Sequence, residues 1–246
     1  MNVEKRANII KKWIDDYCKN ASFSPKSLVV GISGGIDSSV VSTLCALTGR
    51  KTIALSMPIK QIKSQHDLSM RHGEWLSSKF KNIEFKIIEM EKIFNLFKET
   101  LVDFDSEHGL ANSRARLRMS ALYQVAAANK GLVVGTGNKV EDFGVGFYTK
   151  YGDGGVDISP IADCNKTHVW ELGKHLGILQ EVIEAEPTDG LWNDGRNDKD
   201  QLGMSYKELE NAMLNPNDPN YKKYLEIRKK NIHKMNPIPV CKFDDI

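Results

Sequence analysis

The segment SLVVGISGGIDS, residues 27–38, joins an apolar run rich in β-branched residues to a glycine-rich turn. The run ends at Ile32 and predicts a buried strand, and the apolar stretch Val40 to Leu47 predicts a helix directly after the turn. A strand, a glycine loop and a helix in this order gather backbone N–H groups and a helix N-terminus around one point. The segment therefore predicts a phosphate-binding site.

The residue types within the turn agree with this interpretation. Gly34 and Gly35 have no Cβ, so the backbone can approach phosphate oxygens closely, and Ser33 and Ser38 add hydroxyl donors. The turn lacks the Gly-Lys-Ser/Thr ending of a P-loop and the third glycine of a dinucleotide fingerprint. A plain strand-to-helix turn is the alternative, but Asp37 places a carboxylate where a phosphate site needs a metal ligand.

Strands and helices continue to alternate after this segment. Apolar, nearly continuous strands are expected at 52–57, 83–90 and 132–136, and helices at 63–80, 91–104 and 112–129. This alternation predicts an α/β fold of three layers, in which helices cover both faces of a parallel, Rossmann-like sheet. Ligands bind beyond the carboxyl ends of such strands, so the loops at 31–38, 57–62 and 135–142 should converge on one site.

The remaining segments complete a single predicted domain over residues 1–246. Amphipathic or charged helices are expected at 3–19, 166–176, 206–214 and 220–230. Two passages rich in glycine and polar residues, 138–165 and 186–203, are expected to be long functional loops.

Composition excludes several classes of protein. The 34 Lys and Arg residues nearly balance the 32 Asp and Glu residues, which argues against a nucleic-acid partner. The N-terminus mixes charges into its apolar residues, so we expect no membrane span or signal peptide and a cytoplasmic protein. Cys18, Cys45, Cys164 and Cys241 are far apart, which predicts free thiols without structural zinc or disulfides.

Several motifs, in the expected order, carry a resemblance to a known family. SGGIDS, residues 33–38, resembles the PP-motif of the N-type ATP pyrophosphatases, which split ATP into AMP and pyrophosphate. GTGNKVE at 135–141 and FYTKYGDGGVD at 147–157 resemble the two central motifs of NAD synthetases. NSRARLRM at 112–119, PTDGL at 187–191 and the pair His233-Lys234 are similar to further motifs of that family. The resemblance implies an adenine-nucleotide alpha-hydrolase-like fold.

The resemblance also implies a set of ATP and metal ligands. Asp37 and Glu141 would share one Mg²⁺ with the ATP phosphates. Nine positions separate Glu141 from Lys150, one more than in many members, so Asp142 is the alternative metal ligand. The residues implied to contact ATP are Gly31, Ile32, Ser33, Gly34, Gly35, Ile36, Asp37, Ser38, Thr136, Lys166 and Thr188.

A second set of residues would bind deamido-NAD, the implied acceptor substrate. The arginines of the motif at 112–119 could instead form a solvated helix face, but the resemblance assigns Arg116 to the substrate, and a guanidinium fork suits phosphate and ribose oxygens. The full set is Arg116, Lys150, Asp157, His233 and Lys234. Family members of this kind form homodimers that share the substrate across the interface.

The implied reaction is the amidation of deamido-NAD. Its nicotinate carboxylate attacks ATP, pyrophosphate leaves, and ammonia displaces AMP from the adenylated intermediate to give NAD. Asp37 and Asp157 are the catalytic candidates, with Asp157 holding or deprotonating ammonia. The short segment before residue 27 has no room for the amidohydrolase (glutaminase) domain of glutamine-dependent relatives, so we expect free ammonia as the nitrogen donor.

Two other functions remain open at this point. Another ATP pyrophosphatase, such as a GMP synthetase ATPase subunit or a tRNA-modifying ligase, would share the PP-motif. A non-catalytic nucleotide-binding protein would be expected to have lost Asp37 or the carboxylate at position 141, and both are present.

Overall fold

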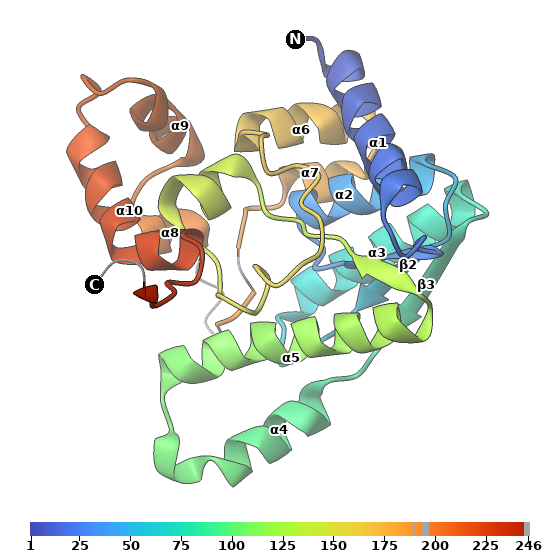
Figure 1. Ribbon diagram of the computed structural model, residues 1–246, viewed down its shortest axis with the longest axis horizontal. Helices are drawn as coiled ribbons and strands as arrows, with labels where there is room; N and C mark the ends of the chain where they lie inside the picture. The colour runs from blue at the N-terminus through green and yellow to red at the C-terminus, as the bar shows by residue number, and fades with distance from the viewer. Residues whose placement is uncertain (189, 193–196, 244–246) are drawn as a thin grey trace.

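A parallel sheet of four strands lies at the centre of the protein, in a computed structural model that describes residues 1–188, 190–192 and 197–243 (Figure 1). The strand order is β3-β2-β1-β4, and every neighbouring pair is parallel. The strands are β1 (Ser27–Gly31), β2 (Thr52–Ser56), β3 (Ile83–Ile87) and β4 (Gly131–Val133). The predicted α/β class with a parallel sheet is confirmed.

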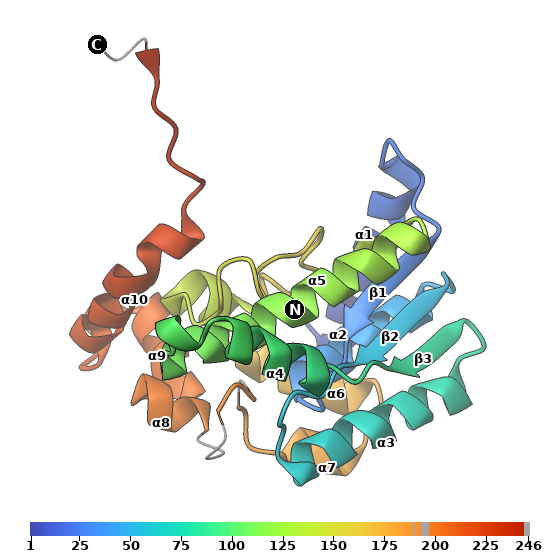
Figure 2. The same cartoon turned by 90° about the horizontal axis from the view of Figure 1, so that it is seen from below.

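Successive side chains of β1 point into two different hydrophobic cores, because side chains alternate across a strand. Leu28 and Val30 belong to one core and Val29 to the other. The first core packs against α1 (Val3–Asn20), α2 (Ile36–Leu47), α3 (Lys63–Lys79), α6 (Lys166–His175) and α7 (Gln180–Glu184). The second packs against α4 (Glu91–Thr100) and α5 (Glu107–Ala128), which lie together on the opposite face of the sheet (Figure 2). The three predicted layers are thus present.

A third hydrophobic cluster lies beyond the sheet. It joins a π-helix, η2 (Lys139–Val145), to α8 (Asp198–Leu202), α9 (Tyr206–Leu214) and α10 (Tyr221–Met235). Val140, Leu209 and Tyr224 are among its buried members. After α10 the chain runs away from the body as an extended segment (Figure 2).

Several element boundaries differ from the sequence predictions. The helix expected over 91–104 ends at Thr100 and is followed by a 3₁₀ turn, η1 (Val102–Phe104). Helix α5 begins at Glu107 rather than at residue 112, because the Ser106 side chain accepts a hydrogen bond from Gly109 N and caps the helix. The expected loop at 138–165 contains η2, and the short helices α7 and α8 were not predicted.

The cysteines are free, as predicted, with Cys241 exposed and the other three buried. No helix in the described ranges combines the length and the apolar character needed to cross a bilayer.

Candidate active site

The glycine loop at 31–38 packs tightly against the start of α3. Gly34 has a φ of +89°, and a Cβ built there would lie 2.6 Å from the Gln65 carbonyl oxygen and 2.8 Å from Ser69 N. Both obstacles are backbone atoms, which cannot move aside as a flexible side chain would. Glycine is therefore required here both by backbone conformation and by space.

The serines of the loop hold its shape through short-range hydrogen bonds. Ser33 N donates to Ser38 Oγ at 3.2 Å, and Ser38 Oγ donates to the Gly35 carbonyl at 3.0 Å. Gly35 is the N-cap of α2 and has no side chain that could cap the first-turn N–H groups. These donors, together with the positive end of the helix dipole, suit an anion.

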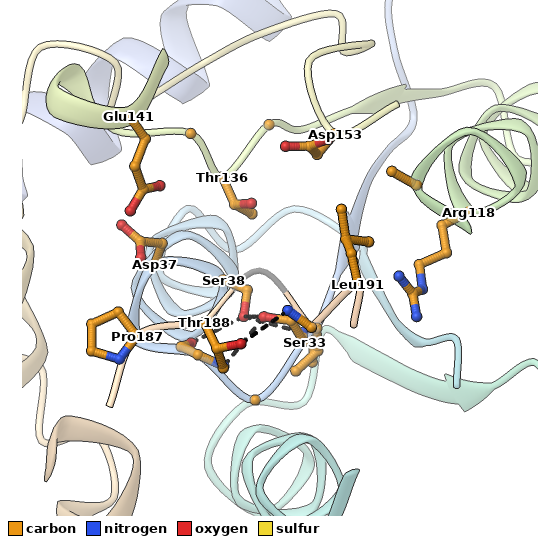
Figure 3. Close-up of a pocket in the computed structure, with 18 of the residues that line it drawn as sticks. Ser33, Asp37, Ser38, Arg118, Thr136, Glu141, Asp153, Pro187, Thr188 and Leu191 are labelled. Carbon is orange, nitrogen blue, oxygen red and sulfur yellow. Dashed lines mark hydrogen bonds between the residues drawn. The ribbon is translucent and has the colours of Figure 1, made fainter. Parts of the chain in front are cut away.

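A crevice opens in front of this loop, at the carboxyl ends of the strands (Figure 3). All eleven residues that the resemblance assigned to ATP line it, including Thr136 from the end of β4, Lys166 from the start of α6 and Thr188. Asp189, which belongs to the motif at 187–191, lies outside the described residues. The sequence prediction that separate strand-end loops converge on one site is confirmed.

Two carboxylates, Asp37 and Glu141, face one another on one side of the crevice (Figure 3). A lysine joins them. Lys166 Nζ lies 2.5 Å from Asp37 Oδ2 and 2.8 Å from Glu141 Oε1. The Lys166 side chain is 3% exposed, and each carboxylate side chain is 16% exposed. The structure thus places Lys166, a predicted ATP ligand, as the counter-ion of the two predicted metal ligands.

The pKa values in this cluster reflect burial opposed by charge. Burial raises the pKa of Asp37, and the nearby Glu141 charge adds to this effect. Burial alone would also raise the pKa of Glu141, but the Lys166 charge and the hydrogen bonds from Lys166 and Tyr206 outweigh it, and the pKa is lowered. Burial alone would lower the pKa of Lys166, whereas the two carboxylates raise it. The lysine is therefore a firmly protonated cation.

The π-helix positions Glu141 rather than Asp142 opposite Asp37. Asn138 caps it by accepting from Val140 N at 3.0 Å and from Glu141 N at 3.1 Å, and its Nδ2 donates to Asp37 Oδ1 at 2.9 Å. Burial and the neighbouring carboxylates raise the pKa of Asp142 well above its usual range.

Two members of the cluster had no role in the sequence prediction. The Tyr206 hydroxyl makes a short contact with Glu141 Oε1 and lies 2.5 Å from Asp198 Oδ2. Asp198 lines the crevice, and Tyr206 is 8% exposed. Tyr206 lies 65 positions beyond Glu141 with no motif to mark it, and Asp198 could not be given a role because Lys199 follows it where the family often has Glu.

Four of the five residues predicted to bind deamido-NAD, all except Asp157, lie near one another and do not line the crevice. Arg116 Nε donates to the Lys150 carbonyl at 3.3 Å, and Lys150 Nζ donates to the His233 carbonyl at 3.4 Å. Lys234 Nζ donates to the Tyr148 carbonyl at 2.8 Å. The structure brings these basic side chains together from α5, the loop after η2 and the end of α10.

The two aspartates of the motif at 147–157 have different surroundings. The Asp157 carboxylate accepts from Val133 N at 2.7 Å and from the Tyr123 hydroxyl at 3.0 Å, and it is not among the crevice-lining residues. Asp153 lines the crevice, opposite the carboxylate pair (Figure 3). Its place in the quoted motif was a signal that could have singled it out.

Comparison with known proteins identifies the family. The family model for NAD synthase matches residues 6–239. The chain belongs to the NAD synthase family. Among curated members, the NH(3)-dependent NAD(+) synthetase of Archaeoglobus fulgidus is 34% identical, and the alignment covers 100% of both chains.

Solved structures of NAD synthase relatives have the same fold. The NMN synthetase from Francisella tularensis superposes with a TM-score of 0.90 at 29% identity, covering 99% of this chain and 100% of that chain. The NH3-dependent NAD synthetase from Campylobacter jejuni superposes with a TM-score of 0.78 at 28% identity, covering 98% and 100%.

Membership in the NAD synthase family confirms the predicted enzyme class. The protein is a ligase of NAD biosynthesis that amidates deamido-NAD with ATP as co-substrate, and this reading is favoured over the alternative of another ATP pyrophosphatase. The residues predicted to contact ATP line one crevice beside the glycine loop.

Proposed function

We propose that the crevice transfers the adenylyl group of ATP to the nicotinate carboxylate of deamido-NAD. A carboxylate oxygen forms a bond to the α-phosphorus, the bond to the bridging oxygen of the β-phosphate breaks, and pyrophosphate leaves. Ammonia then attacks the acyl carbon, the bond between that carbon and the AMP oxygen breaks, and loss of a proton gives NAD. The observation that carries this proposal is the glycine loop, with the α2 N-terminus, beside the Asp37–Glu141 pair in one crevice.

The carboxylate pair fits a magnesium ion. Asp37 and Glu141 offer the oxygen ligands that Mg²⁺ prefers, and the Lys166 ammonium between them shows that a cation is stable at this position. No group of three or more His, Cys, Asp or Glu residues within the described ranges is arranged to hold a metal ion. Phosphate and water oxygens would therefore complete the coordination. When bound, Mg²⁺ would neutralise the charge of the departing pyrophosphate.

Lys166 has two roles in this proposal. Before ATP binds, it neutralises the carboxylate pair, and once the metal ion and ATP are bound, its charge is available to the phosphates. This agrees with the ATP contact implied by the family resemblance. The side chain would move only within the crevice that it already lines.

We further propose that the basic cluster of Arg116, Lys150, His233 and Lys234 binds deamido-NAD. Its charges suit the two phosphates of a dinucleotide. The predicted role of Asp157 in holding or deprotonating ammonia is retained as a proposal, and Asp153 is the competing candidate because it lines the crevice. The two assignments lead to different expectations for the corresponding variants.

A homodimer is the proposed assembly, with the substrate site near the interface. Helix α4 and the following turn η1 carry apolar side chains that face solvent: Leu96, Val102 and Phe104 are 65%, 67% and 80% exposed. An apolar surface of this kind marks an interaction site. Helix α5 lies beside α4 and carries Arg116, so a second copy covering α4 would come close to the proposed substrate cluster (Figure 2).

The cytoplasm is the proposed location. Ammonia is the proposed nitrogen donor. The curated NH(3)-dependent NAD(+) synthetase of Archaeoglobus fulgidus aligns with this chain over its full length. Glutamine supporting the reaction as well as ammonium salts do would contradict this assignment.

Nicotinate mononucleotide is a second candidate acceptor. The TM-score of 0.90 with the structure named NMN synthetase exceeds the 0.78 with the one named NAD synthetase. Both acceptors present the same nicotinate carboxylate to ATP, so the crevice chemistry is unchanged. The ratio of kcat/KM for the mononucleotide and for deamido-NAD distinguishes them, and we expect it to favour deamido-NAD.

The test of the proposed function is a product balance. Incubation with ATP, Mg²⁺, ammonium chloride and deamido-NAD should give AMP, pyrophosphate and NAD in equal amounts, and xanthosine monophosphate should be inert. Formation of ADP and phosphate in place of AMP and pyrophosphate would overturn the adenylyl-transfer step.

A further inference from the structure

We propose that Tyr206 is a positioning residue that holds Glu141 as a metal ligand and links it to Asp198 and Pro187 of the crevice wall. This inference rests on the proposed function, because it takes Asp37 and Glu141 to be the ligands of Mg²⁺. It assigns a role to a tyrosine that lies outside every motif of the sequence.

The contact with Glu141 comes first. The Tyr206 hydroxyl and Lys166 Nζ both reach Glu141 Oε1, so two donors fix the same oxygen. When a metal ion displaces the lysine, Tyr206 would remain as the side-chain partner of Glu141. Partners of this kind orient metal-binding carboxylates and tune their affinity for the ion.

Tyr206 is itself held rigidly. Its ring is buried in the cluster of η2, α9 and α10, and it packs edge-on against Trp170, with ring centroids 6.0 Å apart and planes at 87°. It follows Ser205, which caps α9 through a reciprocal pair of hydrogen bonds with Glu208. A hydroxyl on such a fixed ring defines where the Glu141 carboxylate can lie.

The second contact of the hydroxyl reaches a neighbouring part of the crevice wall. Tyr206 Oη lies 2.5 Å from Asp198 Oδ2, and Asp198 N donates to the Pro187 carbonyl at 3.0 Å. Pro187 and Thr188 line the crevice where the resemblance places ATP. One hydroxyl therefore lies between the proposed metal ligand and the proposed nucleotide wall, so its loss should weaken binding of the metal–ATP complex.

The test is a binding measurement on the Tyr206→Phe variant, which loses the hydroxyl but keeps the ring and its packing. Mn²⁺, a paramagnetic substitute for Mg²⁺, is titrated into the intact protein with a non-hydrolysable ATP analogue and followed by electron paramagnetic resonance. We expect the dissociation constant for Mn²⁺ to rise by about 10- to 100-fold. Tyr224→Phe, a matched change in the same buried cluster, should leave it unchanged.

Two further variants separate the possible outcomes. Asp198→Asn probes the same hydroxyl from its other side, and it should weaken Mn²⁺ binding less than Tyr206→Phe does. If Tyr206→Phe lowers Tm but binds Mn²⁺ as the wild type does, the tyrosine only packs, and the inference is wrong. Glu141→Gln separates failure of the metal site from failure of the role of Tyr206. If Glu141→Gln binds Mn²⁺ as the wild type does, the metal site itself is wrong. If Glu141→Gln binds Mn²⁺ more weakly but Tyr206→Phe binds it as the wild type does, only the role of Tyr206 is wrong.

Discussion

Replacing Lys166 should convert the carboxylate pair into a metal site that works without ATP. In Lys166→Met the ammonium is lost while a side chain of similar reach remains. Asp37 and Glu141, each 16% exposed, then face one another without the cation that neutralised them. The variant should be less stable than the wild type, and Mg²⁺ alone should restore much of the loss.

The magnitude follows from burial. Breaking a buried ion pair by removing one partner costs about 3–5 kcal/mol. For a chain of this length each kcal/mol lowers Tm by about 2–4 °C, so the expected fall is about 6–20 °C. Mg²⁺ at about 100 times its dissociation constant adds about 2.7 kcal/mol, at least half of the lost stability.

Thermal unfolding without nucleotide, at increasing MgCl₂, measures both effects. The wild type should respond weakly, because Lys166 already occupies the position. Lys139→Met is the matched control, since Lys139 pairs with the 95%-exposed Asp163 at the surface and should change Tm by little. If Lys166→Met unfolds at the wild-type temperature, or if Mg²⁺ raises its Tm no more than that of the wild type, the reasoning is refuted.

Three other predictions follow from the site and the core. Gly34→Ala should abolish ATP-dependent AMP formation, because its Cβ would overlap backbone atoms of α3. Gly49→Ala is the control and should stay active, because Gly49 also has a positive φ, +77°, but has open space around it. Comparable activity of the two variants would contradict the packing argument. Burial lowers the pKa of His72 from 6.5 to about 4. Between these two pH values the imidazole is therefore protonated in the unfolded chain and neutral in the folded one. The free energy of unfolding should therefore be at its full value above pH 6.5 and fall by about 3 kcal/mol as the pH drops towards 4. In His72→Gln the denaturant concentration at the unfolding midpoint should change less with pH over this window. Asp153→Asn and Asp157→Asn separate the two candidate bases. Each variant is assayed at saturating ammonium for adenylate formation and for NAD formation. The variant that forms the adenylate normally but makes little NAD identifies the residue that holds or deprotonates ammonia.

The convergence of the strand-end loops on one crevice could be predicted from the sequence, whereas Lys166 and Thr188 were named only through the family resemblance. In a parallel sheet, Asp37 after β1 and Thr136 after β4 must meet at one edge, whatever packs around them. The three-layer fold could be predicted as well, since the strands are short, mostly apolar and each followed by a helix.

Contacts between distant segments could not be predicted in this way. The Tyr206–Glu141 contact spans 65 positions and depends on how α9 packs against the π-helix. The π-helix itself is set by the Asn138 cap and by burial of Val140 rather than by periodicity. The ion pairs of Lys166 with Asp37 and Glu141 were also missed. The family resemblance assigns Lys166 to ATP, and it does not say which protein groups the lysine contacts when ATP is absent.

Isotope transfer tests the central claim, adenylyl transfer to the nicotinate carboxylate, most directly. Deamido-NAD labelled with ¹⁸O in that carboxylate is converted with ATP, Mg²⁺ and ammonium, and the AMP is analysed by mass spectrometry. The proposed reaction predicts one labelled oxygen in each AMP formed, because the oxygen that attacks the α-phosphorus leaves with it. Unlabelled AMP formed together with NAD, or label in inorganic phosphate, would contradict the mechanism.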